Sequence, residues 1–348
     1  MHSVTSLKRI TLAGLLAGAL TLTAPGVAFA DWPPSSGTQG RTEQSGSASG
    51  GTLTSRVTFS GSVRGSGTSS SVRPVTNWTP PACWYEPRSA EDFARYVEDM
   101  YTETVNTPGQ HSYAKTSVGM FRNEYKDGTY KNYNLDIKDE GNWWVAVVDE
   151  DRWMEPAAQA CNKQPFWVEN GDAPPVDNAV SPQILAELAY NRIQLPSTEV
   201  TLAPQGTTKV NLATWAWLDD AKFKEVSVTA SLNIAGLNIQ ATTTAKPVAL
   251  RIEPGTPDAT TYPGSGICRA NADGSVGEPY ARGKAERTPP CGVKYLRSSG
   301  KGTFNLRATV TWQISWTGTG NPQPTGLPDG TFGNDQAVTV EEIQSVNR

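Results

Sequence analysis

The hydrophobic positions of residues 90–104 repeat with the spacing of a helix rather than that of a strand. One helical face collects the apolar side chains of this segment, namely Phe93, Tyr96, Val97, Met100 and Tyr101. Ser89 stands three residues before Asp92 in a sequence that resembles a capping box, with Asp in place of the usual Glu. We therefore expect a helix over 90–104.

A second helical pattern begins at Ser181, which is a typical N-cap followed by Pro182 at the first helical position. Its apolar stripe comprises Ile184, Leu185, Leu188 and Ile193. Leu195 and Pro196 mark its end, because proline cannot continue a helix. The pattern predicts a connecting helix over 181–196.

Three segments between these helices are typical of strands, at 113–121, 130–137 and 143–148, and turns separate them. Together with the helix over 90–104 they predict a small α+β domain over 77–180.

From residue 197 to residue 348 no helical period is strong, and short β-type segments recur. They are 199–202, 207–212, 226–232, 237–244, 248–252, 303–315 and 336–341. Many short strands with Gly and Pro turns predict a β-sandwich. We expect Trp312 and one of Trp215 and Trp217 in its core, and a long polar loop over 254–290.

The first 76 residues contain two further segments. Lys8 and Arg9 precede an apolar run, and Ala28-Phe29-Ala30 follows it, which predicts a secretory signal peptide over 1–30. The alternative is an uncleaved anchor. Residues 31–76 are rich in Ser, Gly and Thr and predict a disordered tether, with a short β-hairpin around 51–59 as the alternative. No later segment is long and apolar enough for a membrane span.

An even number of cysteines in an exported chain predicts two disulfides among Cys83, Cys161, Cys268 and Cys291. Three pairings are open, and we expect Cys83–Cys161 and Cys268–Cys291 because each pair then lies inside one predicted domain. The spacings do not suit a zinc site. The net charge of −4 disfavours nucleic acid as a partner.

Several motifs of the C-terminal half occur in an order that resembles secreted actinobacterial (Streptomyces-type) proteins with a PKD-like domain. They are Leu195-Pro196, LATWAW at 212–217, ATTTAKPV at 241–248, the Cys268 and Cys291 pair, YLRSS at 295–299, ATVTWQISW at 308–316 and VEEIQSVN at 340–347. The resemblance implies an Ig/PKD-like β-sandwich that serves as a spacer or a binding module. The glycine-rich turn typical of PKD domains is degenerate at 251–258. The expected fold is thus mainly β. Along the chain, the disordered tether is followed by the small α+β domain and then by the C-terminal β-sandwich.

Catalytic signatures are scarce. His111 is the only histidine after the signal peptide, and the chain has no Gly-x-Ser-x-Gly elbow, dinucleotide-binding loop or Walker loop. We expect no catalytic residues, no metal and no cofactor. The alternative is a cell-wall glycan hydrolase using a carboxylate pair in the tryptophan-bearing region 136–155, from Asp136, Asp139, Glu140, Asp149, Glu150, Asp151 and Glu155.

Two groups of residues are candidates for binding. Trp143 and Trp144 would stack on glycan. The loop residues would contact a polar protein or glycan, and they are Tyr262, Arg269, Tyr280, Arg282 and Lys284. We expect a secreted or cell-wall-associated, non-catalytic binding or structural protein whose partner is cell-wall glycan or another envelope protein. A subunit of a surface or secretion complex is the other alternative to a hydrolase.

Overall fold

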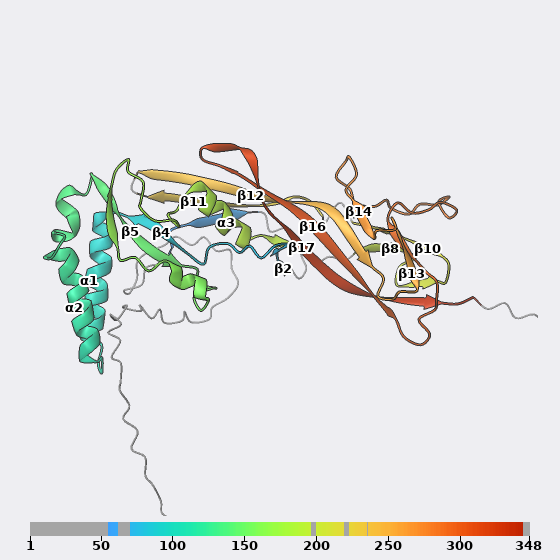
Figure 1. Ribbon diagram of the computed structural model, residues 1–348, viewed down its shortest axis with the longest axis horizontal. Helices are drawn as coiled ribbons and strands as arrows, with labels where there is room; N and C mark the ends of the chain where they lie inside the picture. The colour runs from blue at the N-terminus through green and yellow to red at the C-terminus, as the bar shows by residue number, and fades with distance from the viewer. Residues whose placement is uncertain (1–54, 62–69, 196–199, 219–222, 235, 344–348) are drawn as a thin grey trace, which may run out of the picture. The chain divides into compact units, whose positions relative to one another are not determined.

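The computed structural model describes residues 55–61, 70–195, 200–218, 223–234 and 236–343, all within one compact unit, Thr38–Arg348 (Figure 1). The expected signal peptide and the first part of the expected tether lie outside these residues. Antiparallel strands dominate the described part, so the fold is mainly β, as expected.

The first part of the fold is a three-stranded antiparallel sheet, built in the order β4 (Cys83–Arg88), β5 (Gly141–Val148) and β6 (Phe166–Glu169). Helix α1 (Ala90–Asn106) follows β4 and confirms the expected helix. The Ser89 hydroxyl accepts a hydrogen bond from the Asp92 backbone N–H at 3.1 Å, as a capping box requires. The strand expected over 143–148 is confirmed by β5.

Two of the predicted strands are wrong. Residues 113–121 belong to helix α2 (Ser112–Lys126), because Val118, Phe121 and Tyr125 are spaced to share one helical face. Val118 is buried, and Phe121 and Tyr125 pack on the core. Residues 130–137 contain the 3₁₀ segment η1 (Asn132–Ile137), in which Tyr133 and Asn134 adopt positive φ. A left-handed backbone cannot form an extended strand. The pattern of apolar residues in this segment does not indicate the positive φ angles.

The helix after Ser181 is confirmed as α3 (Pro182–Asn191), and the Ser181 hydroxyl caps it by accepting from the Ile184 N–H at 3.2 Å. The helix ends earlier than expected. Ile193 is buried beyond it, and Gln194–Leu195 form the short strand β7.

The largest sheet follows the order β1-β11-β12-β16-β17-β3, with β14 on β12 and β9 on β17. Its strands are β1 (Thr58–Gly61), β3 (Arg73–Pro74), β9 (Thr207–Lys209), β11 (Val226–Ile234), β12 (Leu237–Glu253), β14 (Ile267–Arg269), β16 (Phe304–Gly318) and β17 (Asn321–Glu341). The long strands β12, β16 and β17 run side by side (Figure 1). Helix α3 packs on this sheet, where the Thr243 hydroxyl donates to the Ala186 carbonyl at 2.7 Å.

The second sheet of the C-terminal half has the order β13-β15-β10-β8. Its strands are β8 (Thr201–Ala203), β10 (Ala213–Trp217), β13 (Ala259–Tyr262) and β15 (Gly292–Tyr295). Its Tyr295 ring stacks on Phe304 of β16 with the ring centroids 5.3 Å apart, so the two sheets share a core. Trp312 is buried in that core, as expected, whereas Trp215 is buried outside it, beside Tyr280.

Strand lengths depart from the expectation. The segments 237–244 and 248–252 are one continuous strand, β12, and 336–341 is only the last part of β17. The expected loop 254–290 is not structureless either, because it contains β13 and β14.

The prediction of a disordered tether is wrong for residues 55–61 and 70–76. Strand β1 pairs with β11, and β3 pairs with β17. Strand β2 (Ser70–Ser71) pairs with β7. The alternative of a local hairpin also fails for its described part, since Thr58 pairs with Ser231 rather than with a nearby residue. Composition could not show this, because the stabilising partners are remote in sequence.

A buried acid fixes the start of this segment. Glu86 of β4 is fully buried and accepts hydrogen bonds from the Ser55 hydroxyl (2.6 Å), the Arg56 backbone N–H (2.9 Å) and the Trp84 indole (2.7 Å). It also forms an ion pair with Arg88 at 3.1 Å. A buried carboxylate needs such partners, and here they attach the N-terminal segment to β4.

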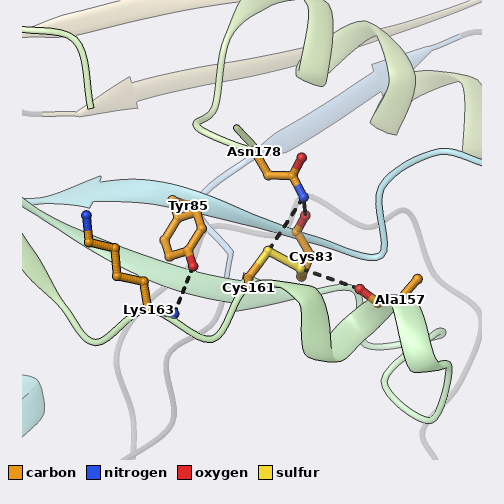
Figure 2. Close-up of a disulfide and its surroundings, with 6 residues drawn as sticks. All are labelled: Cys83, Tyr85, Ala157, Cys161, Lys163 and Asn178. Atoms are coloured by element: carbon orange, nitrogen blue, oxygen red, sulfur yellow. Dashed lines mark hydrogen bonds between the residues drawn. A yellow bond between two sulfur atoms is a disulfide. The ribbon is translucent and has the colours of Figure 1, made fainter. Parts of the chain in front are cut away.

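Both expected disulfides are confirmed, Cys83–Cys161 and Cys268–Cys291. Figure 2 shows the first bond at the start of β4, where the Asn178 amide donates to the Cys83 carbonyl at 3.4 Å. Nearby, the Lys163 backbone N–H donates to the Tyr85 hydroxyl at 3.0 Å (Figure 2). Disulfides of this kind fit an oxidising, extracellular compartment. Within the described ranges, no helix has the length and apolar character needed to cross a bilayer.

Candidate functional site

A cleft of about 350 Å³ lies beside the Cys268–Cys291 disulfide. We call it the disulfide cleft, and its lining residues are Pro263, Ser265, Ile267, Cys268, Arg269, Asn271, Gly277, Pro290 and Cys291. All of them come from the region 254–291, which sequence analysis selected for its length and its two cysteines.

A tight turn and a strand form one wall of the cleft. The Gly266 N–H donates to the Pro263 carbonyl at 2.8 Å, and Gly266 has a φ of +69°. A Cβ atom at Gly266 would lie 2.8 Å from the Ile252 carbonyl oxygen, so this close approach requires glycine. The turn directs β14 along the edge of β12, where Arg269 lies opposite Ala249. The backbone that holds the Arg269 side chain is therefore fixed.

The facing wall is held by Asn271 and Gly277. The Asn271 side-chain amide donates to the Gly277 carbonyl at 3.0 Å and contacts the Ser275 hydroxyl at 2.9 Å. The backbone of this wall also pairs with the end of β10, since the Leu218 N–H donates to the Val276 carbonyl at 2.9 Å. Both walls are thus attached to the sheets and to the disulfide, which preorganises the cleft.

Arg269 is the one charged side chain among the lining residues of the cleft. It is exposed, and in the part of the chain that the structure describes it has no ion pair or side-chain hydrogen bond. The remaining lining combines proline and disulfide surface with a hydroxyl and an amide. An arginine fork in such a setting is available to an anionic group of a ligand.

The other loop candidates have different surroundings. Lys284 donates to the Glu278 carboxylate at 2.5 Å, and its Nζ lies 5.4 Å from the centre of the Trp215 ring. Tyr280 meets the same ring edge-on at 5.8 Å. Trp215 is only 2 % exposed, so Lys284 and Tyr280 help to cover a buried tryptophan. The hydrogen bond from Lys284 lowers the pKa of Glu278.

The structure does not bring all the loop candidates together. Tyr262 is half-buried and immediately precedes Pro263 of the cleft. Arg282 is exposed and lies outside the lining. Of the predicted contact residues, only Arg269 lines the cleft. Sequence reasoning missed Ser265, Asn271 and Pro290, although the Pro263-Gly264-Ser265-Gly266 turn beside Cys268 was a readable signal.

The prediction that Trp143 and Trp144 stack on glycan is wrong. Trp143 is fully buried, stacks on Phe93 with ring centroids 4.5 Å apart, and donates its indole N–H to the Tyr133 carbonyl at 2.8 Å. Trp144 is buried as well. A sugar needs an exposed ring face, and both rings belong to the core of the α+β part.

Three of the seven candidate carboxylates of 136–155 have structural partners, namely Asp149, Asp151 and Glu155. Asp149 is buried, accepts from the Asp151 N–H at 3.0 Å and lies 3.8 Å from Arg192. Asp151 also pairs with Arg192, at 3.0 Å.

Glu155 pairs with Arg152 at 2.7 Å, and this hydrogen bond lowers the pKa of Glu155. A glycosidase acid needs the opposite shift. His111 precedes α2, and its ring stacks on Tyr113. Throughout the described chain, no three His, Cys, Asp or Glu side chains gather as a metal site would require.

Comparison with known proteins gives no relative. No protein-family model, no curated protein and no solved structure matches this chain.

Proposed function

We propose that this protein is a secreted, non-catalytic binding or structural protein of the cell envelope, and that the disulfide cleft is its binding site. The observation that supports this proposal most strongly is the cleft itself, whose walls are attached to two sheets and a disulfide and which presents one unpaired arginine. Binding sites are typically loops held by a rigid scaffold.

The proposal includes an Ig/PKD-like character for the C-terminal half. Two antiparallel sheets with a common core support it, as does the ordered set of motifs between 195 and 347. Such modules act as spacers or present ligand-binding loops at their ends. The partner we propose is cell-wall glycan, with another envelope protein as the alternative.

The test is sedimentation of the mature protein with purified cell wall. We expect the wild type to pellet with the wall in a saturable manner and to release no reducing sugar. Ser265→Trp, which fills the cleft with an indole, should abolish pelleting. The matched control is Ala285→Trp, an exposed position of the same region outside the cleft lining, and it should pellet like the wild type.

Three other outcomes of the sedimentation assay would contradict parts of this proposal. If Ser265→Trp pellets like the wild type while both variants keep their circular dichroism spectrum, the cleft is not the site. If the wild type stays in solution, cell-wall glycan is not the partner, and a subunit of a surface complex becomes the better interpretation. Release of reducing sugar that is lost on substitution of an acid in 136–155 would favour the hydrolase alternative instead.

A further inference from the structure

We infer that the disulfide cleft binds an acidic sugar, and that Arg269 is the residue that binds its carboxylate. This inference rests on the proposed binding function and narrows the ligand class. The inference is based on the lining of one small cleft, which combines the unpaired guanidinium of Arg269, the polar side chains of Ser265 and Asn271, and the rings of Pro263 and Pro290. Each of these features restricts the chemistry of the ligand.

The charge of the ligand follows from the surroundings of Arg269. Two cationic side chains of this region have acidic partners, Lys284 with Glu278 at 2.5 Å and Arg297 with Asp258 at 3.3 Å. Arg282 and Arg287 have no ion pair within the described chain, but neither lines the cleft. Arg269 has none within the described chain. An arginine in a fixed position binds a carboxylate through two parallel N–H···O bonds. The cleft therefore favours an anion.

The number of charges argues for a monoanion. Arg269 is the one cationic residue of the lining, so it neutralises one negative charge. A phosphate monoester carries nearly two charges near neutral pH and would leave one of them uncompensated. The guanidinium fork matches the oxygens of a carboxylate and of a phosphate diester alike, so titration with dimethyl phosphate separates these two monoanions.

The size and the lining of the cleft argue for a single sugar ring. About 350 Å³ lies at the lower end of the volumes of ligand pockets, so the cleft has room for about one sugar ring. Pro263 and Pro290 offer apolar surface to the C–H face of a ring. The Ser265 hydroxyl and the Asn271 amide oxygen lie within the same lining for its hydroxyl groups, while the Asn271 amide nitrogen donates to Ser275 and Gly277.

The experiment is a titration of the mature protein with glucuronic acid and with glucose, followed by NMR or calorimetry. We expect the wild type to bind glucuronic acid more tightly. Arg269→Gln should weaken that binding about 10-fold, the loss expected for one charge-assisted hydrogen-bond pair, and should leave glucose binding unchanged. The matched control, Arg282→Gln, removes an exposed arginine outside the lining and should change the affinity less than about twofold.

Three results would overturn the inference. The first is equal affinity of the wild type for glucose and glucuronic acid, and the second is an equal loss of glucuronic acid affinity in Arg269→Gln and Arg282→Gln. The third is Arg269-dependent binding of acetylglycine or dimethyl phosphate that is tighter than the binding of glucuronic acid. Cell-wall retention without carboxylate selectivity would refute this inference and leave the proposed function standing. Carboxylate selectivity without cell-wall retention would refute the proposed cell-wall function and leave this inference standing. Circular dichroism of each variant separates loss of binding from loss of fold.

Discussion

At the scale of single residues, Glu98 of α1 is an acid with three side-chain partners. It accepts hydrogen bonds from Arg122 (2.8 Å) and Lys126 (2.8 Å) of α2 and from the Tyr133 hydroxyl of η1 (2.5 Å). Burial by itself would raise the pKa of Glu98, but these three donors outweigh burial and lower that pKa to about 2. One carboxylate thus joins the three helical segments of the α+β part.

This arrangement predicts a pH dependence of stability. Because the pKa of Glu98 is lower in the folded chain, its contribution is fully present above the ordinary pKa of 4.5 and is lost as the pH falls towards 2. Glu98→Gln should lower the free energy of unfolding by about 1 kcal/mol at pH 7, since the group is partly solvent-screened. The difference from the wild type should shrink between pH 4.5 and pH 2 in urea titrations.

The control for this prediction is Glu103→Gln, an exposed acid of the same helix that has no ion pair in the described chain. It should leave the stability nearly unchanged at every pH. A difference between Glu98→Gln and the wild type that stays constant down to pH 2 would show that the three donors do not depend on the charge of Glu98.

At the scale of elements, the long strands contain prolines without being interrupted. The register of β12 against β16 shifts between Pro247 and Ala249. In β17, Pro322 and Pro324 lie between the paired residues Asn321 and Thr325, where the register also shifts. A bulge leaves some backbone groups out of the ladder, so proline can occupy it without removing a pairing hydrogen bond. In β12 this explains why the sequence predicted two strands, 237–244 and 248–252, on either side of Pro247.

Docking of the N-terminal strand β3 depends on Gly330 of β17, and this gives a second prediction. A Cβ atom at Gly330 would lie 2.0 Å from a methyl carbon of Val72 and 3.2 Å from the Tyr190 hydroxyl. Gly330→Ala should therefore destabilise the protein by about 1–3 kcal/mol and increase hydrogen exchange in residues 70–76. The measurements are urea unfolding and hydrogen exchange followed by mass spectrometry.

Gly326→Ala is the matched control, because Gly326 belongs to the same strand and a Cβ there would meet no atom within 4 Å. It should exchange like the wild type. If Gly330→Ala also leaves exchange in 70–76 unchanged, the close packing of Val72 on β17 is not what holds this segment.

At the scale of the whole molecule, two disulfides close loops of different length. The bonded cysteines are separated by 78 residues in Cys83–Cys161 and by 23 in Cys268–Cys291. In the chain-entropy model a disulfide stabilises by restricting the unfolded chain, and longer loops gain more. The two bonds therefore restrict different parts of the chain to different extents.

This difference gives the third prediction. Replacing both cysteines of the first pair by alanine should lower the free energy of unfolding by about 4.5 kcal/mol, and the same change in the second pair by about 3.5 kcal/mol. Urea unfolding of the two double variants measures both values. A larger loss for the Cys268–Cys291 pair would mean that strain or contacts in the native state, and not loop entropy, dominate the effect.

Features that depend on a few neighbouring residues could be predicted from the sequence alone. Ser89 and Ser181 cap α1 and α3 through donors three residues ahead, and the pattern therefore predicted both helix starts. The strand β11 followed from local alternation. The pairing Cys268–Cys291 could be expected because both cysteines lie in one predicted domain, and Arg269, a candidate from the long polar loop, lines the cleft.

Tertiary structure decided whatever depends on a remote partner. Strand β1 is stable because it pairs with β11, whose residues lie more than 160 positions further along the chain (Gly61 opposite Val228). Trp143 became a core residue because Phe93 and Tyr133 pack around it. The disulfide cleft exists because β14 lies along β12 and Gly277 packs on β10. No local pattern records such contacts, since their free energy is gained only when distant segments meet.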